Sequence, residues 1–401
     1  MVILNAHTII PIFNLALRGM ININRRTFFT AILSLISFNA WADDQPTQSL
    51  STPSMFGPLA LNPNPYNIDA GPLGTIYASG IASGLGVWQD HYAPHDENSM
   101  LDISNAQLVV QKIDGPVQFY IQAGEYTLPS IGEVYQRAEY TTDHFFGAVP
   151  IAYVKIAPTD NFSVQAGKLY TLIGTENTFD FQNATIEHGL LWNQTNDLSR
   201  GVQVNYSQGA YSGSLALTDG FYSDHLNWLS GALTYTIDAN NSVTVLGSGN
   251  FHHDNANSLT TPLTLNNSQL AQLNYSYTTG PWVFSPTLQY THVPKDTDIG
   301  LMASAATYGS GLTTKYNINT QWNIAARAEY IDSTGNTNVL YGPGSNAWSL
   351  TITPTFQQGI FFIRPETSYV KATDTTAGFA FGQKGDQTSQ ARMLIETGII
   401  F

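Results

Sequence analysis

The chain has 401 residues, 43% of them hydrophobic and only 11% charged, and its formal net charge at pH 7 is −14. An acidic chain of this kind is a poor partner for nucleic acid. The sequence contains no cysteine, which excludes disulfide bonds, thiolate metal sites and a thiol nucleophile.

The N-terminal part of the chain has the features of a secretory signal peptide. Arg25 and Arg26 form a charged region, and the apolar stretch that follows them is too short to span a bilayer. Small residues ending at Ala42 suit cleavage directly afterwards. We therefore predict a signal peptide over residues 1–42, with Met20 as the true start of translation.

The rest of the chain begins with a proline-rich lead-in and continues as short alternating segments. Residues 43–72 contain six prolines and predict an irregular lead-in, which lies either in the periplasm or in the lumen of the folded body. After residue 42 no run approaches the ~20 consecutive apolar residues of a membrane helix, so any membrane crossing must use strands. From residue 74 onward, segments of about ten residues alternate with period two and predict β-strands.

Short and long gaps alternate between these strands. The short gaps are predicted hairpin turns at 114–116, 158–161, 208–210, 238–241, 279–281, 319–321 and 357–359. The long gaps are predicted loops near 89–101, 127–149, 171–198, 219–227, 253–268, 294–306, 333–345 and 373–388. With one unpaired strand at each end, 74–88 and 389–401, this gives about 16 strands.

This sorting of turns predicts the fold class. Short turns on one side and long loops on the other are the plan of an all-β, transmembrane antiparallel β-barrel, here over residues 73–401. A barrel of about 16 strands is wide enough for an aqueous channel. The alternative, a soluble β-sandwich, has no reason to sort its turns in this way.

The strand faces and strand ends agree with a barrel. In the last strand Arg392 and Glu396 share one face, while Met393 and Ile395 share the other, which suits water on one side and lipid on the other. Aromatic residues gather beside the short turns, as in the girdle at a membrane interface. The predicted girdle consists of Phe119, Phe162, Tyr206, Tyr211, Tyr235, Trp282, Tyr316, Trp322, Phe356, Phe361 and Phe401.

Four stretches in the middle of the chain carry a family resemblance. They are Gly-Lys-Leu-Tyr-Thr-Leu-Ile-Gly at 167–174, Phe-Gln-Asn at 181–183, Gly-Leu-Leu-Trp-Asn at 189–193 and Arg-Gly-Val-Gln-Val-Asn-Tyr at 200–206. Together with the strand pattern they resemble the OmpL-like β-barrel porins of Gram-negative bacteria, over residues 56–401. The resemblance implies a passive channel in the bacterial outer membrane, in contact with the bilayer and lipopolysaccharide. It also implies that the barrel-assembly machinery reads the C-terminal strand through Phe401, and it supplies no catalytic residues.

Strand parity places several charged residues in the lumen. A charge on a water-filled wall costs little, whereas a charge on the lipid face near the midplane costs ~2 to 4 kcal/mol. The predicted basic wall of the pore consists of Lys155, Lys315, Arg327, Arg364 and Arg392. The predicted pore-lining acids beside it are Glu329, Glu366 and Glu396.

The third long loop, residues 171–198, is the longest and carries Glu176, Asp180 and Glu187. Loops of this length usually have a function. Its position and charge resemble the constriction loop of general diffusion porins, which folds into the barrel and faces a basic wall. We therefore predict a transverse electric field between loop carboxylates and wall cations. The alternative is a loop that folds outward over the surface.

Two clusters suggest other chemistry. His252, His253 and Asp254 offer metal-binding side chains, but adjacent histidines on a surface loop seldom build a closed site, so polar loop decoration is favoured. His188 beside Glu187 suggests a hydrolase, although no spacing arranges a nucleophile, a base and an orienting group.

The prediction is therefore a porin for passive diffusion of small hydrophilic solutes or ions, with no catalytic residues, cofactor or metal. The alternatives are a structural or adhesive barrel with a sealed lumen, and a membrane-embedded hydrolase. A plugged active importer is disfavoured because the lead-in is too short for a plug domain. The sequence leaves the solute open, and it leaves open whether the chain is a monomer or a homo-oligomer.

Overall fold

The computed structural model describes residues 65–94 and 96–401. The predicted signal peptide and most of the lead-in therefore lie outside the described residues. No helix in the described part of the chain is both long and apolar enough to cross a membrane.

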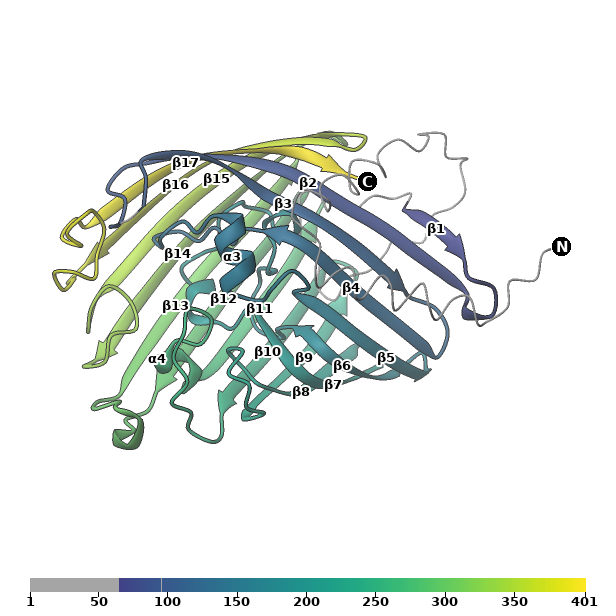
Figure 1. Ribbon diagram of the computed structural model, residues 1–401, viewed down its shortest axis with the longest axis horizontal. Helices are drawn as coiled ribbons and strands as arrows, with labels where there is room; N and C mark the ends of the chain where they lie inside the picture. Colours follow the sequence, from purple (N-terminus) through teal and green to yellow (C-terminus); the bar gives the residue numbers. More distant parts are fainter. Residues whose placement is uncertain (1–64, 95) are drawn as a thin grey trace. The chain divides into compact units, whose positions relative to one another are not determined.

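Sixteen antiparallel strands, β2 to β17, form a closed ring in which each strand pairs with its sequence neighbours and β17 pairs with β2 (Figure 1). This confirms the predicted all-β barrel and its strand number. The strands are β2 (Thr75–Gln89), β3 (Ser99–Lys112), β4 (Val117–Tyr126), β5 (Ile151–Thr159), β6 (Phe162–Tyr170), β7 (Leu198–Gln208), β8 (Tyr211–Thr218), β9 (Trp228–Asp238), β10 (Asn241–Asn250), β11 (Gln269–Thr279), β12 (Trp282–Val293), β13 (Ala305–Asn317), β14 (Trp322–Gly335), β15 (Asn346–Gln358), β16 (Phe361–Thr373) and β17 (Ser389–Ile400).

Helical structure is confined to short segments between strands. The two α-helices in the described residues are α3 (Ala138–His144) and α4 (Leu263–Asn266), and the 3₁₀ turns there are η2 (Gly71–Leu73), η3 (Asp180–Gln182), η4 (Trp192–Gln194) and η5 (Thr297–Ile299). All the predicted hairpin turns lie between paired strands. In Figure 1 the long loops gather at the end of the barrel marked by α4, and the short turns lie at the end where the chain terminates.

The seam that closes the barrel extends to the last residue. β17 pairs with β2 from Arg392 opposite Gln89 to Ile400 opposite Ile81. Beyond it, the backbone N–H of Gly80 donates to the carbonyl of Phe401, at 2.6 Å, and that of Phe401 donates to the carbonyl of Gly80, at 2.9 Å. The C-terminal aromatic residue is thus the last rung of the seam.

The lead-in is less irregular than predicted. A further short strand, β1 (Tyr66–Asp69), pairs with residues 75–78 at the start of β2. The reason is that β17 ends before it reaches this part of β2, and an edge without a partner leaves backbone groups unsatisfied. The alternation of the sequence gives no sign of this strand, because it spans only four residues.

The two faces of the strands differ as expected for a barrel in lipid. On β14 the inward Ala325, Arg327 and Glu329 are buried, whereas the outward Trp322 and Tyr330 are exposed. On the short-turn side, aromatic rings contact each other across neighbouring strands. These pairs are Tyr211 with Tyr235, Trp282 with Tyr316, and Trp322 with Phe356, with ring centroids 4.6 to 4.9 Å apart. Outward-facing aromatics at the strand ends suit the headgroup zone.

Candidate functional site: the barrel interior

The segment between β6 and β7, residues 171–197 and here named the β6–β7 loop, contacts the inner face of the barrel. Most of its residues are buried, including the charged Asp180 and Glu187. It meets β11 through Gly174, whose N–H donates to the Gln272 side chain at 3.0 Å. It meets β12 through Leu191, whose carbonyl accepts from Gln289 at 2.9 Å. The loop therefore lies against two strands that follow it in the sequence by about 98 residues.

Arg327 of β14 is the first charged anchor of this loop. It forms an ion pair with Glu176, and it donates to the hydroxyl of Thr185 and to the carbonyl of Glu187, both at 2.7 Å. The neighbouring wall acid Glu329 lies 3.3 Å from the Arg327 guanidinium. Hydrogen bonds that involve a charged group contribute ~1.5 to 3 kcal/mol each, so this cluster is a strong local attachment.

Wall carboxylates also bind the loop backbone. Glu329 accepts from the N–H groups of Leu190, at 2.8 Å, and Leu191, at 3.2 Å. Glu366 of β16 accepts from the N–H of Glu187 at 2.9 Å and from the hydroxyl of Thr353 at 2.6 Å. These acids satisfy backbone donors that would otherwise be buried without a partner.

Arg364 of β16 forms a second anchor. It pairs with Glu396 of β17, with one guanidinium–carboxylate distance of 3.0 Å, and both side chains are fully buried. It also donates to the carbonyls of Asp180, at 3.3 Å, and Asn183, at 3.1 Å. The pair therefore faces the loop backbone, not the carboxylate of Asp180.

Arg392 of β17 forms a third anchor. Its guanidinium lies 2.7 Å from the Glu187 carboxylate and donates to the carbonyl of Ser130 at 2.8 Å. It also donates to the Gln89 side chain at 2.7 Å. Glu187 is thus held between β17 and β16, where Ser368 donates to its other oxygen.

The arrangement of these charges differs from the predicted transverse field. Glu176 and Glu187 touch Arg327 and Arg392 directly, so no water-filled gap separates the opposite charges. Asp180 instead accepts from Asn105 of β3 at 2.6 Å, and its second carboxylate oxygen is buried without a partner. Burial and the nearby Glu396 carboxylate raise the pKa of Asp180. The loop acids act here as attachment points.

Two glycines on the inner face of β13 make room for the loop. A Cβ on Gly309 would lie 2.3 Å from the Cδ2 of Leu191, and a Cβ on Gly311 would lie 3.2 Å from its Cδ1. Gly189 is equally confined, because a Cβ there would lie 2.2 Å from the Glu329 carboxylate. Gly309 and Gly311 therefore form a socket for Leu191, which sequence reasoning missed.

The two lysines of the predicted basic wall occupy another part of the interior. Lys155 lines a cavity near the short turns, together with Gln118, Asn205 and Ser214. Lys315 lies on the same face of β13 as the socket glycines, three residues from the start of the β13–β14 turn, and is half-buried. The sequence groups the five cations in one wall, and the structure brings the three arginines directly against the β6–β7 loop.

The wall formed by β8 to β11 is mostly uncharged. Its inward positions, apart from Trp228 and Asp238 near the strand ends, hold hydroxyl, amide and small or aliphatic side chains. Thr234 and Thr244 hydrogen-bond to each other at 2.8 Å across β9 and β10. Alternating Ser and Thr residues in the sequence were the available signal for this polar wall.

His188, the residue on which the hydrolase alternative rests, is held by ring stacking and by backbone carbonyls. It is fully buried and stacks on Trp192 with ring centroids 4.4 Å apart. Its ring nitrogens lie 3.1 Å from the carbonyl of Pro129 and 2.8 Å from that of Asn177. These two carbonyls and the Asn183 amide are the polar groups in contact with the ring, and none of them is a nucleophile.

Comparison with known proteins gives one family match and several solved structures of similar fold. The family model described as putative beta-barrel porin-2, OmpL-like, matches residues 75–401. The anion-selective porin from Comamonas acidovorans has a similar structure (TM-score 0.58, 13% identity, 81% of this chain and 99% of that chain), and so has the outer membrane protein OmpT of Vibrio cholerae, folded in vitro (0.55, 12%, 82% and 98%). Salmonella typhi OmpF in complex with daunomycin is also similar (0.55, 14%, 84% and 100%). No curated protein sequence matches this chain.

Proposed function

The chain belongs to the OmpL-like family of β-barrel porins of the bacterial outer membrane, and from this premise we propose that it lets small hydrophilic solutes or ions diffuse passively across that membrane. The closed ring of sixteen strands supports the proposal, because a barrel of this size encloses more space than its wall side chains fill. Passive diffusion requires no catalytic group and no cofactor, so the proposed protein is not an enzyme.

The β6–β7 loop is the proposed constriction. The observation that carries this is the attachment of one loop to three wall arginines, Arg327, Arg364 and Arg392. A segment fixed at several points inside a barrel narrows it by occupying space. We propose that solutes pass beside the mostly uncharged wall of β8 to β11, where Ser, Thr and Asn side chains offer hydrogen bonds to a hydrated solute.

One observation favours a second candidate, a barrel without an open pore. Burial of most of the β6–β7 loop is also what a sealed lumen would require. Planar-bilayer recording of the purified full-length protein separates the two. Stable stepwise conductance supports the porin, whereas insertion of folded barrels without any conductance steps supports a structural or adhesive barrel.

A triple variant tests the role of the loop. Glu176→Gln, Asp180→Asn and Glu187→Gln together remove the loop carboxylates that pair with Arg327 and Arg392, leave Glu329 beside Arg327, and change the size of each side chain little. The proposal expects a shift of reversal potential toward anions that shrinks in 1 M salt, where the Debye length falls to ~3 Å. A variant that keeps the wild-type reversal potential at low salt would show that the loop does not border the ion path.

We also propose partners for assembly and for the mature barrel. The seam rung formed by Phe401 supports recognition of the C-terminal strand by the barrel-assembly machinery. The outward aromatic and aliphatic faces suit lipid and, in the outer leaflet, lipopolysaccharide. Trimers occur among the similar structures, since one OmpT structure is described as a trimer form, and a homo-oligomer is the corresponding proposal here.

A further inference from the structure

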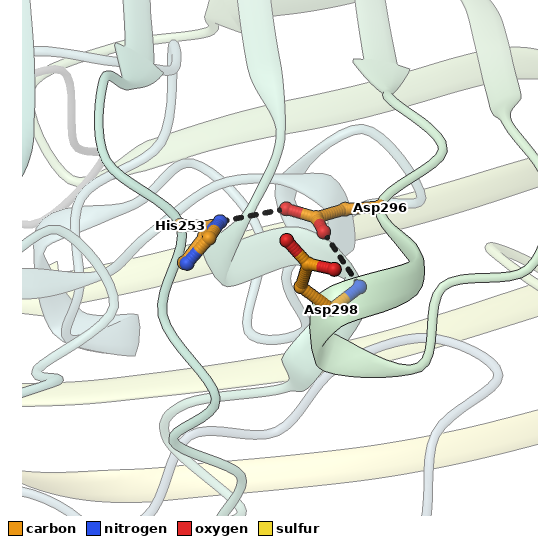
Figure 2. A group of neighbouring side chains, drawn as sticks. All are labelled: His253, Asp296 and Asp298. Atoms are coloured by element: carbon orange, nitrogen blue, oxygen red, sulfur yellow. Dashed lines mark hydrogen bonds and ion pairs between the residues drawn. The ribbon is translucent and has the colours of Figure 1, made fainter.

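Three side chains from two outer loops converge at the long-loop end of the barrel. His253 comes from the β10–β11 loop, and Asp296 and Asp298 come from the β12–β13 loop. Figure 2 shows the imidazole and the two carboxylates turned toward one another. One ligand atom from each residue lies within 4.8 Å of the others, and His253 Nδ1 is 3.0 Å from Asp296 Oδ2.

The two aspartates are held in place by the backbone around them. Asp296 caps η5, accepting from the N–H of Asp298 at 3.0 Å, and exchanges backbone hydrogen bonds of 2.9 and 2.8 Å with Leu301. Leu301 and Ile299 pack in an apolar cluster with Val293 of β12. Because this turn is anchored to the barrel, the two carboxylates do not depend on a flexible loop tip for their spacing.

A cavity next to these residues supplies a second, independent observation. It measures 550 Å³ and is bordered by His253 and Asp298 together with His225, His252, Asp254 and Asn227. Asn227 is only 4% exposed, and its side-chain carbonyl oxygen has no hydrogen-bond partner. The cavity therefore leaves room for an ion and its water ligands beside His253 and Asp298, with two further imidazoles, of His225 and His252, along its border.

We propose that His253, Asp296 and Asp298 bind a divalent transition-metal ion of the Zn²⁺ class. Zinc–nitrogen and zinc–oxygen bonds of ~2.0 to 2.2 Å place neighbouring ligand atoms of a tetrahedron about 3.3 to 3.5 Å apart, close to the distance between His253 and Asp296. Side-chain rotation suffices to bring Asp298 to the same separation. Imidazole nitrogen favours zinc, nickel or copper over calcium or magnesium, which prefer oxygen ligands alone.

A bound ion would connect two loops that no strand pairing joins at this end. The β10–β11 and β12–β13 loops also meet here through the His253–Asp296 ion pair, whose members are partly exposed, and through Leu263, which packs on the apolar cluster of Leu301 and Ile299. An exposed ion pair contributes little to stability, about 0 to 1 kcal/mol. The metal would thus fix the relative position of the two loops at the outer rim.

The test uses the full-length barrel, refolded in detergent without a histidine tag and treated with EDTA. Titration calorimetry with Zn²⁺ alone should give one site per chain. His253→Gln and Asp298→Asn should each weaken binding at least tenfold, while His144→Gln on α3, an exposed histidine of another loop, should leave it unchanged. Asp296→Asn is unsuitable because that side chain also caps η5. Heat modifiability on gels verifies that each variant folds.

Two further measurements separate the proposed site from surface binding. Lowering the pH from 7.5 to 5.5 should weaken Zn²⁺ binding, because protons compete for the imidazole. Millimolar Ca²⁺ or Mg²⁺ should not displace the ion. Equal Zn²⁺ affinity in wild type and His253→Gln, or displacement by Ca²⁺, would overturn the assignment. Neither result bears on conductance, so the site can fail while the porin function stands.

Discussion

The glycine socket offers the sharpest test of how the β6–β7 loop is held. Gly309→Val would place side-chain carbon where Leu191 now lies, since even a Cβ would come within 2.3 Å of its Cδ2. Overpacking a well-filled site costs ~1 to 3 kcal/mol. Leu191→Ala should cost ~2 to 5 kcal/mol, because this leucine is only 6% exposed.

The two changes should not add. In the double variant the shortened side chain at position 191 leaves room for the valine at position 309, so its loss of stability should be smaller than the sum by ~0.5 to 3 kcal/mol. Unfolding titrations in urea, followed by heat modifiability or tryptophan fluorescence, measure the four members of this cycle. Gly247→Val is the matched control, because Gly247 faces outward and a Cβ there would meet its nearest neighbour only at 3.9 Å.

Single-channel recording provides the functional readout of the same cycle. Gly309→Val should raise conductance or open-channel noise, because the loop loses a fixed point on β13, and the double variant should return toward wild type. Strict additivity of the two stability changes, combined with wild-type conductance in Gly309→Val, would refute the socket as an attachment of the loop.

Three other predictions concern assembly, register and charge. Deletion of Phe401 removes the last rung of the seam and should leave protein that is exported but poorly inserted, as a lower yield of heat-modifiable, protease-resistant barrel; a normal yield would contradict this. Thr244 faces inward, so Thr244→Arg should fold normally. Val245 is 55% exposed on the outer face, so Val245→Arg should lose ~2 to 4 kcal/mol of folding free energy if it lies near mid-bilayer. Folding titrations measure both variants, and equal losses would refute the register. The hydrogen bond that the His225 ring donates to the Asp254 carboxylate, followed by the charge of that carboxylate, raises the pKa of His225 above 6.5. The contribution of this pair to stability is therefore full below pH 6.5 and is lost as the pH rises through the raised value. NMR titration should show a lower His225 pKa in Asp254→Asn, and an unchanged value would exclude the pair.

The strands could be predicted from the sequence because the signals that define them are local. On β14, apolar and polar residues alternate from Trp322 to Tyr330. Because successive side chains of a strand point to opposite faces, the face of one residue predicts the face of the next. Turn residues such as Gly280 and Gly359, both with positive φ, mark the hairpins in the same local way. Fold class and strand order follow directly from such patterns.

The interior could not be predicted to the same degree, because its contacts join distant parts of the chain. Arg327 and Glu176 are 151 residues apart, and parity alone reveals only that the arginine points inward. Parity also identifies Thr353 as inward, but it cannot show that this residue is fully buried, with its hydroxyl donating to Glu366. Gly309 carries no signal in the sequence that distinguishes a socket from an ordinary strand glycine.

The pairing of loop and wall charges changes where ion preference should arise. Arg327 and Arg392 each lie within 3.3 Å of a carboxylate, and at such short distances opposite charges largely cancel for an ion that passes outside the pair. Screening at physiological salt weakens what remains beyond about 8 Å. Charged groups outside these pairs should therefore have the larger influence on ion preference, in particular Lys155 in the cavity near the short turns. Lys155→Gln should therefore change the reversal potential more than Glu187→Gln alone, although Glu187 belongs to the proposed constriction.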